Sequence, residues 1–456
     1  MAIETARISV AGRITGIGIR GLLGKNLWVF ADQALISAAN FFFMVLLARQ
    51  LGAADFGQFV LTYTVLMFTN SLQGALFTQP HNVLGATRHE ERYRDYTTAT
   101  TLTQTGFAII MGLLISTVAI GALALGHDVG WSLLALAPTS ITWQLHEFVR
   151  RILFTQSAAT TVFALDVIAY GGQIGLLVVL WQTGWLSVTS ALVAIGVASG
   201  CGLVVGLWRV RDHLGSVPPA QSVRATFHEN WIFGRWLLGS AIAYWLSTQL
   251  YPILIAGFVG VAATGGLRAA QTLLGPTHIL LKGLESIAPS DGARAYERDG
   301  ATGLRRSLKR LVVPGGIAMA AYCGTVAFLA GPLVQALLGD GYESFSWLVR
   351  VYALFYAFSF LNAVASIALR SMGLSAPMFF AQGTSAVVVL TLGVAAVALF
   401  GLVGAAIGVV VNGAMIATVL WYRVHREMAR PPAQSTEYRS TIGVVSIGFD
   451  SGNDQG

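Results

Sequence analysis

Ionisable side chains inside long apolar runs are the residues of this sequence best suited to do chemistry. Residues 265–288 form the most polar of these runs and contain Arg268, His278, Lys282 and Glu285. Charged groups at membrane depth are costly, so they usually face a helix-bundle interior or a water-filled cavity. In a helix, Arg268 and Lys282 lie two heptads apart and share a face about 21 Å long. We therefore expect a cationic face that suits an anionic headgroup.

Each of these residues also has a purely structural interpretation. Arg268 and Lys282 can extend toward the membrane surfaces, and Lys282 can instead pair with Glu285. His278 can titrate near neutral pH, but a lone histidine is more often simply hydrogen-bonded. The Gly275–Pro276 pair between the two basic residues predicts a kink or an unwound turn in the helix.

Three acidic residues are candidates for coupling to an ion: Asp32, Asp166 and Glu285. Asp32 lies roughly 9–10 Å into the first apolar run and is also a candidate for the cavity lining. Alternatively, Asp32 lies at the membrane interface or pairs with Lys25. Asp166 lies in the fifth run, where the alternative is a structural pair with a neighbouring helix. Arg49 is a further cavity candidate, although a residue near an outer helix end can also extend to the surface.

Four polar residues crowd the cytoplasmic end of the fourth run: His146, Glu147, Arg150 and Arg151. Charged residues commonly accumulate where a membrane helix meets water. The position therefore favours a solvated helix end, and a cytoplasmic gate is the alternative.

The elements that must position these residues are transmembrane helices. The chain of 456 residues is 55% hydrophobic and 11% charged, with a mean hydropathy of +0.67. Soluble domains carry roughly 25% charged residues, so this chain lacks the charge to cover a soluble surface. A membrane helix needs about 20 mostly apolar residues. Twelve runs meet this requirement, at residues 26–48, 57–79, 101–125, 130–149, 160–182, 187–208, 236–258, 265–288, 311–334, 347–369, 376–399 and 401–422.

The lysines and arginines predict the orientation of the chain. Most of the 28 fall in alternate gaps between the runs, whereas Arg49 alone falls in the opposite gaps. Because positive residues concentrate in cytoplasmic loops, both termini are expected in the cytoplasm. The predicted organisation is a cytoplasmic segment at 1–25, a six-helix bundle at 26–208, a cytoplasmic linker at 209–235, a second six-helix bundle at 236–422 and a disordered cytoplasmic tail at 423–456.

A faint internal repeat relates the two halves. Residues 48–57 and 256–265 each join the first and second run of a half. They share alanine or glycine at four aligned positions, namely Ala48 with Ala256, Gly52 with Gly260, Ala54 with Ala262 and Gly57 with Gly265. The repeats have the same orientation, which predicts an axis along the membrane normal. The expected fold is all-α, with about twelve transmembrane helices in two pseudo-symmetric six-helix bundles around a central cleft, which is typical of a transporter.

Motifs for catalysis or nucleotide binding are missing from the sequence. It contains no P-loop, HExxH motif, paired cysteines or nucleophile elbow. Cys201 and Cys323 lie within apolar runs, where they fit as small core residues. The basic residues are spread along the chain, so nucleic acid is not an expected partner. We therefore expect a transporter with no catalytic residue, no metal and no cofactor.

The segment 47–57, Leu-Ala-Arg-Gln-Leu-Gly-Ala-Ala-Asp-Phe-Gly, resembles a signature of polysaccharide and O-antigen flippases, A-R-x-L-G-x-x-x-[FY]-G. These flippases belong to the multidrug/oligosaccharidyl-lipid/polysaccharide (MOP) exporter superfamily. The polar run that starts at Gly266-Leu267-Arg268 is also similar to that family. Residues 77–82 depart from it, because they lack the basic residue that members often carry after the second helix.

The resemblance implies a function and partners. Such proteins move undecaprenyl-pyrophosphate-linked oligosaccharides from the cytoplasmic to the outer leaflet of a bacterial inner membrane by alternating access. By helix position, Arg268 and Lys282 would face the pyrophosphate. The implied partners are the lipid-linked oligosaccharide, membrane lipids, a polysaccharide polymerase and glycosyltransferases.

Two other functions remain open. A multidrug exporter of the same superfamily, coupled to H⁺ or Na⁺, would use Asp32 or Asp166 against cationic drugs, although Arg268 and Lys282 would repel cations. A membrane polymerase or ligase acting on lipid-linked sugars is expected to carry a substantial outer loop. Every predicted outer loop of this chain is short.

Overall fold

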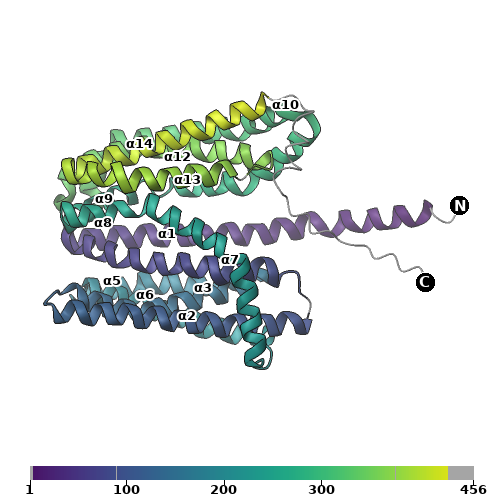
Figure 1. Cartoon of the computed structure of the whole chain (residues 1–456), viewed down its shortest axis with the longest axis horizontal. Coiled ribbons are helices and arrows are strands. Elements are labelled where there is room, and N and C mark those ends of the chain that lie inside the picture. The colour runs from purple at the N-terminus through teal and green to yellow at the C-terminus, as the bar shows by residue number, and fades with distance from the viewer. Residues whose placement is uncertain (1–3, 89, 375, 430–456) are drawn as a thin grey trace.

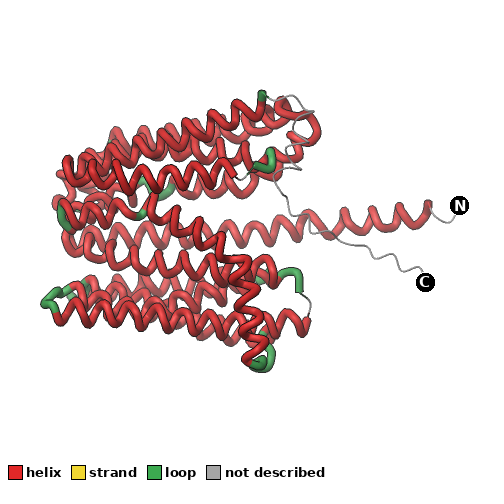
Figure 2. The backbone as a smooth tube through the Cα atoms, viewed as in Figure 1, coloured by secondary structure: helices red, strands yellow, loops and turns green. Residues whose placement is uncertain are grey.

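The structure of the protein is a computed structural model that describes residues 4–88, 90–374 and 376–429 (Figure 1). This described part contains helices and no strand (Figure 2). Seven of its helices are long and apolar enough to cross a membrane, or eight if Ala220–Thr248 and Leu250–Phe258, bent by 41°, form one span. The prediction of an all-α, multi-pass membrane protein is confirmed, and the number twelve stays a prediction.

The helices of the first half are α1 (Glu4–Gln73), α2 (Glu90–Ala124), α3 (Val129–Thr155), α4 (Ala159–Asp166), α5 (Gly172–Gln182) and α6 (Val188–Val210). Those of the second half are α7 (Ala220–Thr248), α8 (Leu250–Phe258), α9 (Val261–Leu273), α10 (Thr277–Phe328), α11 (Ala330–Leu338), α12 (Ser346–Ser371), α13 (Ala376–Val388) and α14 (Val394–Met428). Short π-helical or 3₁₀ segments connect some of them, namely η1 (Gly74–Thr78), η2 (His81–Gly85), η3 (Val167–Gly171), η4 (Arg211–His213), η5 (Asp340–Phe345) and η6 (Val389–Gly393).

Three of the long helices turn at an internal glycine. The positive φ angles are 77° at Gly52 in α1, 60° at Gly300 in α10 and 57° at Gly401 in α14. Only glycine adopts such angles without steric cost. The apolar runs on either side of Gly52 and of Gly401 are therefore separate helical segments within one continuous element.

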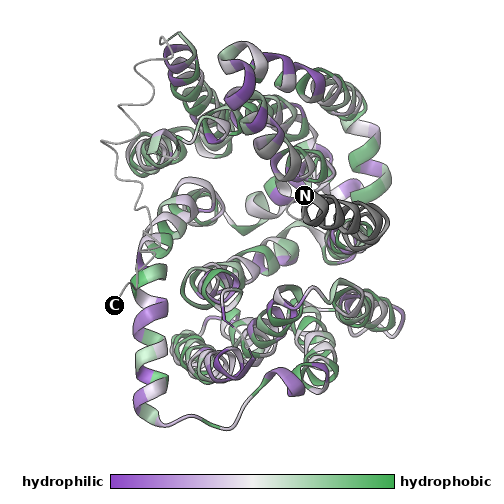
Figure 3. Cartoon of the chain, turned by 90° about the vertical axis from the view of Figure 1, so that its right-hand side faces the viewer, coloured by the Kyte–Doolittle hydropathy of each residue, from purple (hydrophilic) through white to green (hydrophobic). Residues whose placement is uncertain are grey.

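The helices form two groups with α1, α8 and α9 between them. In Figure 1, α2, α3, α5 and α6 lie on one side, and α10, α12, α13 and α14 lie on the other. Within the groups, α3 packs on α2 and α6, and α12 packs on α10 and α14. Between the groups, the most extensive contact joins α1 to α9. Figure 3, which looks along most of the helices, shows the same two groups one above the other.

The outer faces of the helices carry large apolar side chains. On α2, Leu113 is 62% exposed and Val118 is 63% exposed. Exposed surfaces of this kind are stable against lipid hydrocarbon rather than water. The segment expected as a linker at 209–235 is partly helical, because α7 begins at Ala220. Most of the predicted tail, from residue 430, lies outside the described residues.

Candidate functional site

A cluster of charged side chains lies buried within the first group of helices, and Arg150 of α3 is at its centre. Its Nη2 lies 2.6 Å from Oδ2 of Asp166, at the end of α4, and donates to Oδ2 of Asp32, on α1, at 3.3 Å. Its Nη1 donates to both carboxylate oxygens of Glu147 at 2.8 Å. Asp32 and Asp166 have no exposed surface. One guanidinium therefore joins three helices.

The helices around this cluster explain why it is buried. His146 and Arg150 are four residues apart, so both lie on one face of α3. That face packs on α6, where a Cβ added at Gly202 would lie 2.7 Å from Nε2 of His146. Nε2 of His146 is in turn 3.9 Å from Oδ1 of Asp166. Glycine on α6 thus allows the close approach that removes these polar groups from solvent.

A π-helical turn shapes the other side of the cluster. η3 follows Asp166 directly, and its Tyr170 donates from its hydroxyl to Oε1 of Glu147 at 3.5 Å. π-helical turns insert a residue into a helix and are frequent at functional sites. Here the turn lets Asp166 and Tyr170, which are close in sequence, both reach the same cluster.

The cluster contains more acidic than basic groups. Asp32, Glu147 and Asp166 share the single guanidinium of Arg150, and Asp166 lies in addition 3.9 Å from Nε2 of His146. Within the described residues, Oδ1 of Asp32 and Oδ1 of Asp166 accept no hydrogen bond. A buried carboxylate without enough partners favours binding a proton or a cation. The arrangement can therefore take up positive charge.

Two of the sequence interpretations concern this cluster. Asp32 and Asp166 were separate candidates, and the structure brings them together on one guanidinium. The prediction of a solvated end for the 146–151 segment is wrong, because His146 is 2% and Arg150 is 7% exposed. This part of the helix packs on α6, and the four-residue spacing of His146 and Arg150 is a sequence signal that could have revealed a shared partner.

The second polar site lies on α9 and α10. Half-buried Arg268 donates from Nη1 to Oε1 of Gln271 at 3.3 Å, and Nε2 of Gln271 donates to the hydroxyl of Tyr352 on α12 at 3.0 Å. The helix is interrupted between Leu273 and Thr277, as the Gly275–Pro276 pair predicts. The arginine is therefore held on a short, interrupted helix at the contact with α1.

The other candidates on α10 lie beyond this interruption. Nε2 of His278 is 3.1 Å from the hydroxyl of Tyr356. This hydrogen bond is what the purely structural interpretation of the histidine predicts. Lys282 and Glu285 are both exposed, as is Arg49, whose Nη1 donates to the carbonyl of Ala336 at 2.8 Å.

A close crossing of α1 and α9 joins the two helix groups. A Cβ added at Gly57 would overlap the carbonyl oxygen of Val261, and one added at Gly265 would overlap that of Ala53. Ala53 and Gly57 are the repeat equivalents of Val261 and Gly265 in the sequence. The contact is therefore reciprocal, as expected for two elements related by a two-fold axis.

The turn before each crossing helix repeats as well. Gly52 and Gly260 occupy equivalent positions, and their φ angles are +77° and +124°. α1 also carries Asp32 of the buried cluster, and it packs on α9, which carries Arg268. The crossing, the cationic residue and the buried acidic cluster thus lie around one helix, α1.

These features define the class of protein to which the chain belongs. Helices with apolar outer faces, charged groups between them and a reciprocal crossing of two repeats form a membrane transporter fold. A family model described as "Polysaccharide biosynthesis protein" matches residues 22–283. The chain belongs to this family. No curated protein sequence matches the chain.

Solved structures share the fold. The lipid II flippase MurJ, in an inward closed conformation, has a TM-score of 0.70 at 12% identity, over 92% of this chain and 90% of that one. An inward-facing MATE family multidrug transporter of the MOP superfamily has a TM-score of 0.67 at 14% identity, over 88% and 95%. An outward-facing one has a TM-score of 0.59 at 12% identity, over 88% and 94%. The protein thus has the MOP transporter fold, as the sequence resemblance implies.

Proposed function

We propose that the protein is a flippase that moves an undecaprenyl-pyrophosphate-linked oligosaccharide across a bacterial inner membrane for surface polysaccharide synthesis. Three observations support this: the polysaccharide family match, the fold shared with a lipid II flippase, and half-buried Arg268 at the contact between the helix groups. Arg268 carries the proposal, because a guanidinium binds a diphosphate through charge-assisted hydrogen bonds. Lys282, which is exposed on α10, would extend the cationic surface toward the cytoplasm.

The crossing of α1 and α9 supports alternating access as the mechanism. With the termini in the cytoplasm, the glycine contact would lie at the outer end and close the path between the two groups there. The TM-score is also higher with the inward-facing MATE transporter than with the outward-facing one. Release of cargo to the outer leaflet would require Gly57 and Gly265 to separate from the opposing backbone. The termini would then lie in the cytoplasm, where glycosyltransferases supply the cargo, and a polymerase would receive it outside.

The buried acidic cluster is the proposed coupling site. Three carboxylates share one guanidinium, so a proton taken up by Asp32 or Asp166 would weaken an ion pair to Arg150 and loosen the contact of α1 with α3 and α4. Glu285 is exposed on α10, so it is not part of the proposed coupling site. Proton uptake by purified protein on binding of cargo would support this coupling, and an Asp32→Asn, Asp166→Asn double variant should abolish the uptake.

Replacing Arg268 by alanine is expected to reduce polysaccharide export by about ten- to a hundredfold. A hydrogen bond to a charged group is worth roughly 1.5–3 kcal/mol, and about 1.4 kcal/mol corresponds to tenfold in affinity. Export is measured in a strain that depends on this protein, at matched protein levels in the membrane. Arg350→Ala is the control, because Arg350 is an exposed arginine whose Nε donates to the carbonyl of Ala327 at 3.4 Å. Normal export by the Arg268 variant would contradict the proposal.

The second candidate is a multidrug exporter coupled to H⁺ or Na⁺. The likeness to MATE transporters and the buried pair of Asp32 and Asp166 favour it. Arg268 disfavours it, because a cationic site repels cationic drugs. Efflux of a cationic dye by cells that express the protein, without any effect on polysaccharide, would favour the exporter over the flippase.

A further inference from the structure

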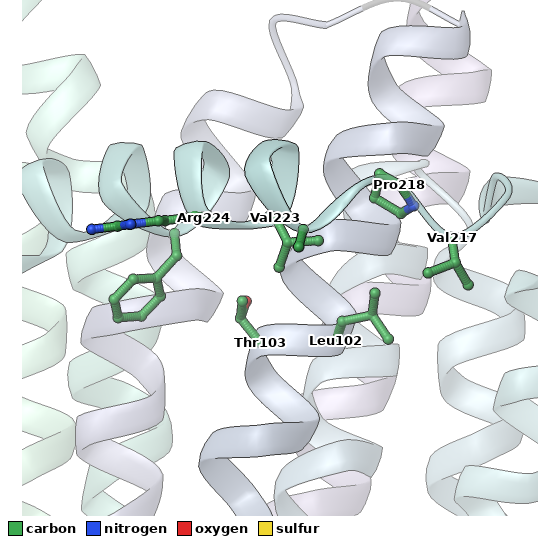
Figure 4. Close-up of a pocket in the computed structure, with 8 residues that line it drawn as sticks. Leu102, Thr103, Val217, Pro218, Val223 and Arg224 are labelled. Atoms are coloured by element: carbon green, nitrogen blue, oxygen red, sulfur yellow. The ribbon is translucent and has the colours of Figure 1, made fainter.

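Residues 229–234 of α7 lie against α2 and the segments that precede it. Nη2 of Arg88 pairs with Glu229 at 2.6 Å, and the hydroxyl of Tyr96 donates to Oδ1 of buried Asn230 at 2.6 Å. Gly234 lies so close to η1 that an added Cβ would be 2.5 Å from the carbonyl oxygen of Ala75. These contacts hold the start of α7 in one position, crossing the helices beneath it (Figure 4).

A pocket of about 580 Å³ lies between α2 and the first turns of α7. It is lined by Leu102, Thr103, Val217, Pro218, Ala220, Val223, Arg224 and Phe227. Figure 4 shows Val223 pointing from α7 toward Thr103 of α2, with Val217 and Pro218 at the other end. The lining is apolar except for Thr103 and Arg224, and the volume is in the range of small-ligand sites, roughly 300–1,000 Å³.

The pocket lies where the helix surfaces change from charged to apolar. On α2, Glu90, Glu91 and Arg94 are exposed, and Leu102, at 41% exposure, is the first exposed large apolar residue. On α6 the order is reversed, because exposed Trp208 precedes exposed Arg209. Tryptophan and charged residues mark the level at which hydrocarbon meets water. The pocket is therefore at the depth of lipid headgroups and the first carbons of their chains.

The wall of the pocket carries one charged residue, Arg224. On the segment that leads to this wall, the guanidinium of Arg209 lies 4.8 Å and that of Arg211 lies 5.3 Å from the ring centre of Trp208, and Arg211 is paired with Asp212 at 3.7 Å. Arg224, on the pocket wall itself, has no acidic partner within the described part of the chain. Glu229, the nearest acid along α7, is already paired with Arg88. The guanidinium of Arg224, beside an otherwise largely apolar wall, thus favours an anionic group.

We propose that this pocket binds one anionic phospholipid of the cytoplasmic leaflet. Its acyl chain lies between Val223 and Leu102, and its phosphate is held by Arg224. Anionic lipids are attracted to basic residues at the cytoplasmic surface, by about 1 kcal/mol for each residue. The element α7 connects the two helix groups. The bound lipid would stabilise the packing of α7 on the first group. This site is separate from Arg268, so it does not depend on which cargo the protein moves.

Native mass spectrometry of the full chain tests this site. The protein is titrated with phosphatidylglycerol or phosphatidylcholine that carry identical acyl chains. We expect the first phosphatidylglycerol to bind more tightly, and Arg224→Gln to weaken that binding about fivefold with no change for phosphatidylcholine. Val223→Trp should fill the pocket and weaken the binding of both lipids. Arg298→Gln is the control, because Arg298 is an exposed arginine paired with Asp299 on α10.

Three results would overturn the proposal. The first is equal affinity of the two lipids for the parent protein, and the second is unchanged phosphatidylglycerol binding by Arg224→Gln. The third is displacement of phosphatidylglycerol by a lower concentration of polyprenyl phosphate, which would assign the pocket to the lipid tail of the cargo. Equal melting temperatures of Arg224→Gln and the parent exclude misfolding as the cause of weaker binding.

Discussion

Replacing Gly57 by valine is expected to abolish polysaccharide export while the protein still reaches the membrane. A Cβ at this position overlaps the carbonyl oxygen of Val261 and lies 2.8 Å from its carbonyl carbon. These are backbone atoms of α9, so they cannot move aside without moving the helix. In a state with the helices separated, the valine would face open space. The substitution therefore favours a conformation that is open at the outer end, and the transport cycle stops.

The open state can be detected by cysteine labelling. Tyr342, which is 1% exposed and meets Phe56 edge to face at 6.5 Å between ring centres, lies beside the crossing. In a background without Cys201 and Cys323, a Tyr342→Cys variant should react poorly with a membrane-impermeant maleimide. Adding Gly57→Val should make it react.

Two comparisons make this result specific. Gly265→Val should act in the same way, because its Cβ overlaps the carbonyl oxygen of Ala53. Gly106→Val on α2 should have no effect on export or labelling, because a Cβ there meets nothing within 4 Å. If Gly57→Val exported normally and left the cysteine at 342 protected, the crossing would not be a moving contact.

Replacing Arg150 by glutamine is expected to destabilise the protein by about 3–5 kcal/mol. The substitution removes the guanidinium that Asp32, Glu147 and Asp166 share, and it leaves their carboxylates buried without a cationic partner. Breaking a buried ion pair on one side costs more than the pair itself contributes, because the remaining charge is still desolvated. The loss is measured as a lower melting temperature and a smaller yield of monodisperse protein in detergent.

Neutralising the acids should restore stability. In an Arg150→Gln, Asp32→Asn, Asp166→Asn variant, the two fully buried carboxylates no longer carry charge, so the melting temperature should return toward that of the parent. Arg294→Gln is the matched control, because Arg294 pairs with Asp291 at an exposed surface, where an ion pair contributes little. An unchanged melting temperature of the Arg150 single variant would show that the cluster is solvated in the membrane.

Several local features could be predicted from the sequence. The Gly275–Pro276 pair does interrupt the helix after Arg268, because proline lacks an amide donor and glycine lacks a side chain that favours the helix. The equivalent glycines at 52 and 260 do take positive φ angles in both halves. Such effects act within a few residues, so the sequence pattern is sufficient to reveal them.

The partners of charged groups could not be predicted in the same way. Arg150 appeared to end a helix in solvent, whereas it is buried against Asp32 and Asp166, and α6 packs on the same face of α3 where Gly202 meets His146. The hydrogen bond from Arg150 to Asp32 joins residues 118 positions apart. Hydropathy along the chain shows that a charge lies in an apolar run, but it carries no information about which other helix packs against that charge.

The sequence by itself determined that this protein is a multi-pass, all-α membrane protein with a repeated segment at 48–57 and 256–265. Composition and the flippase signature are enough for that conclusion, since hydrocarbon admits only chains whose backbone polar groups pair internally. Only the tertiary structure decided that the two repeats cross each other at Gly57 and Gly265, and that three acids converge on Arg150. Both are contacts between distant helices, and their energies depend on packing geometry that is absent from the linear order of residues.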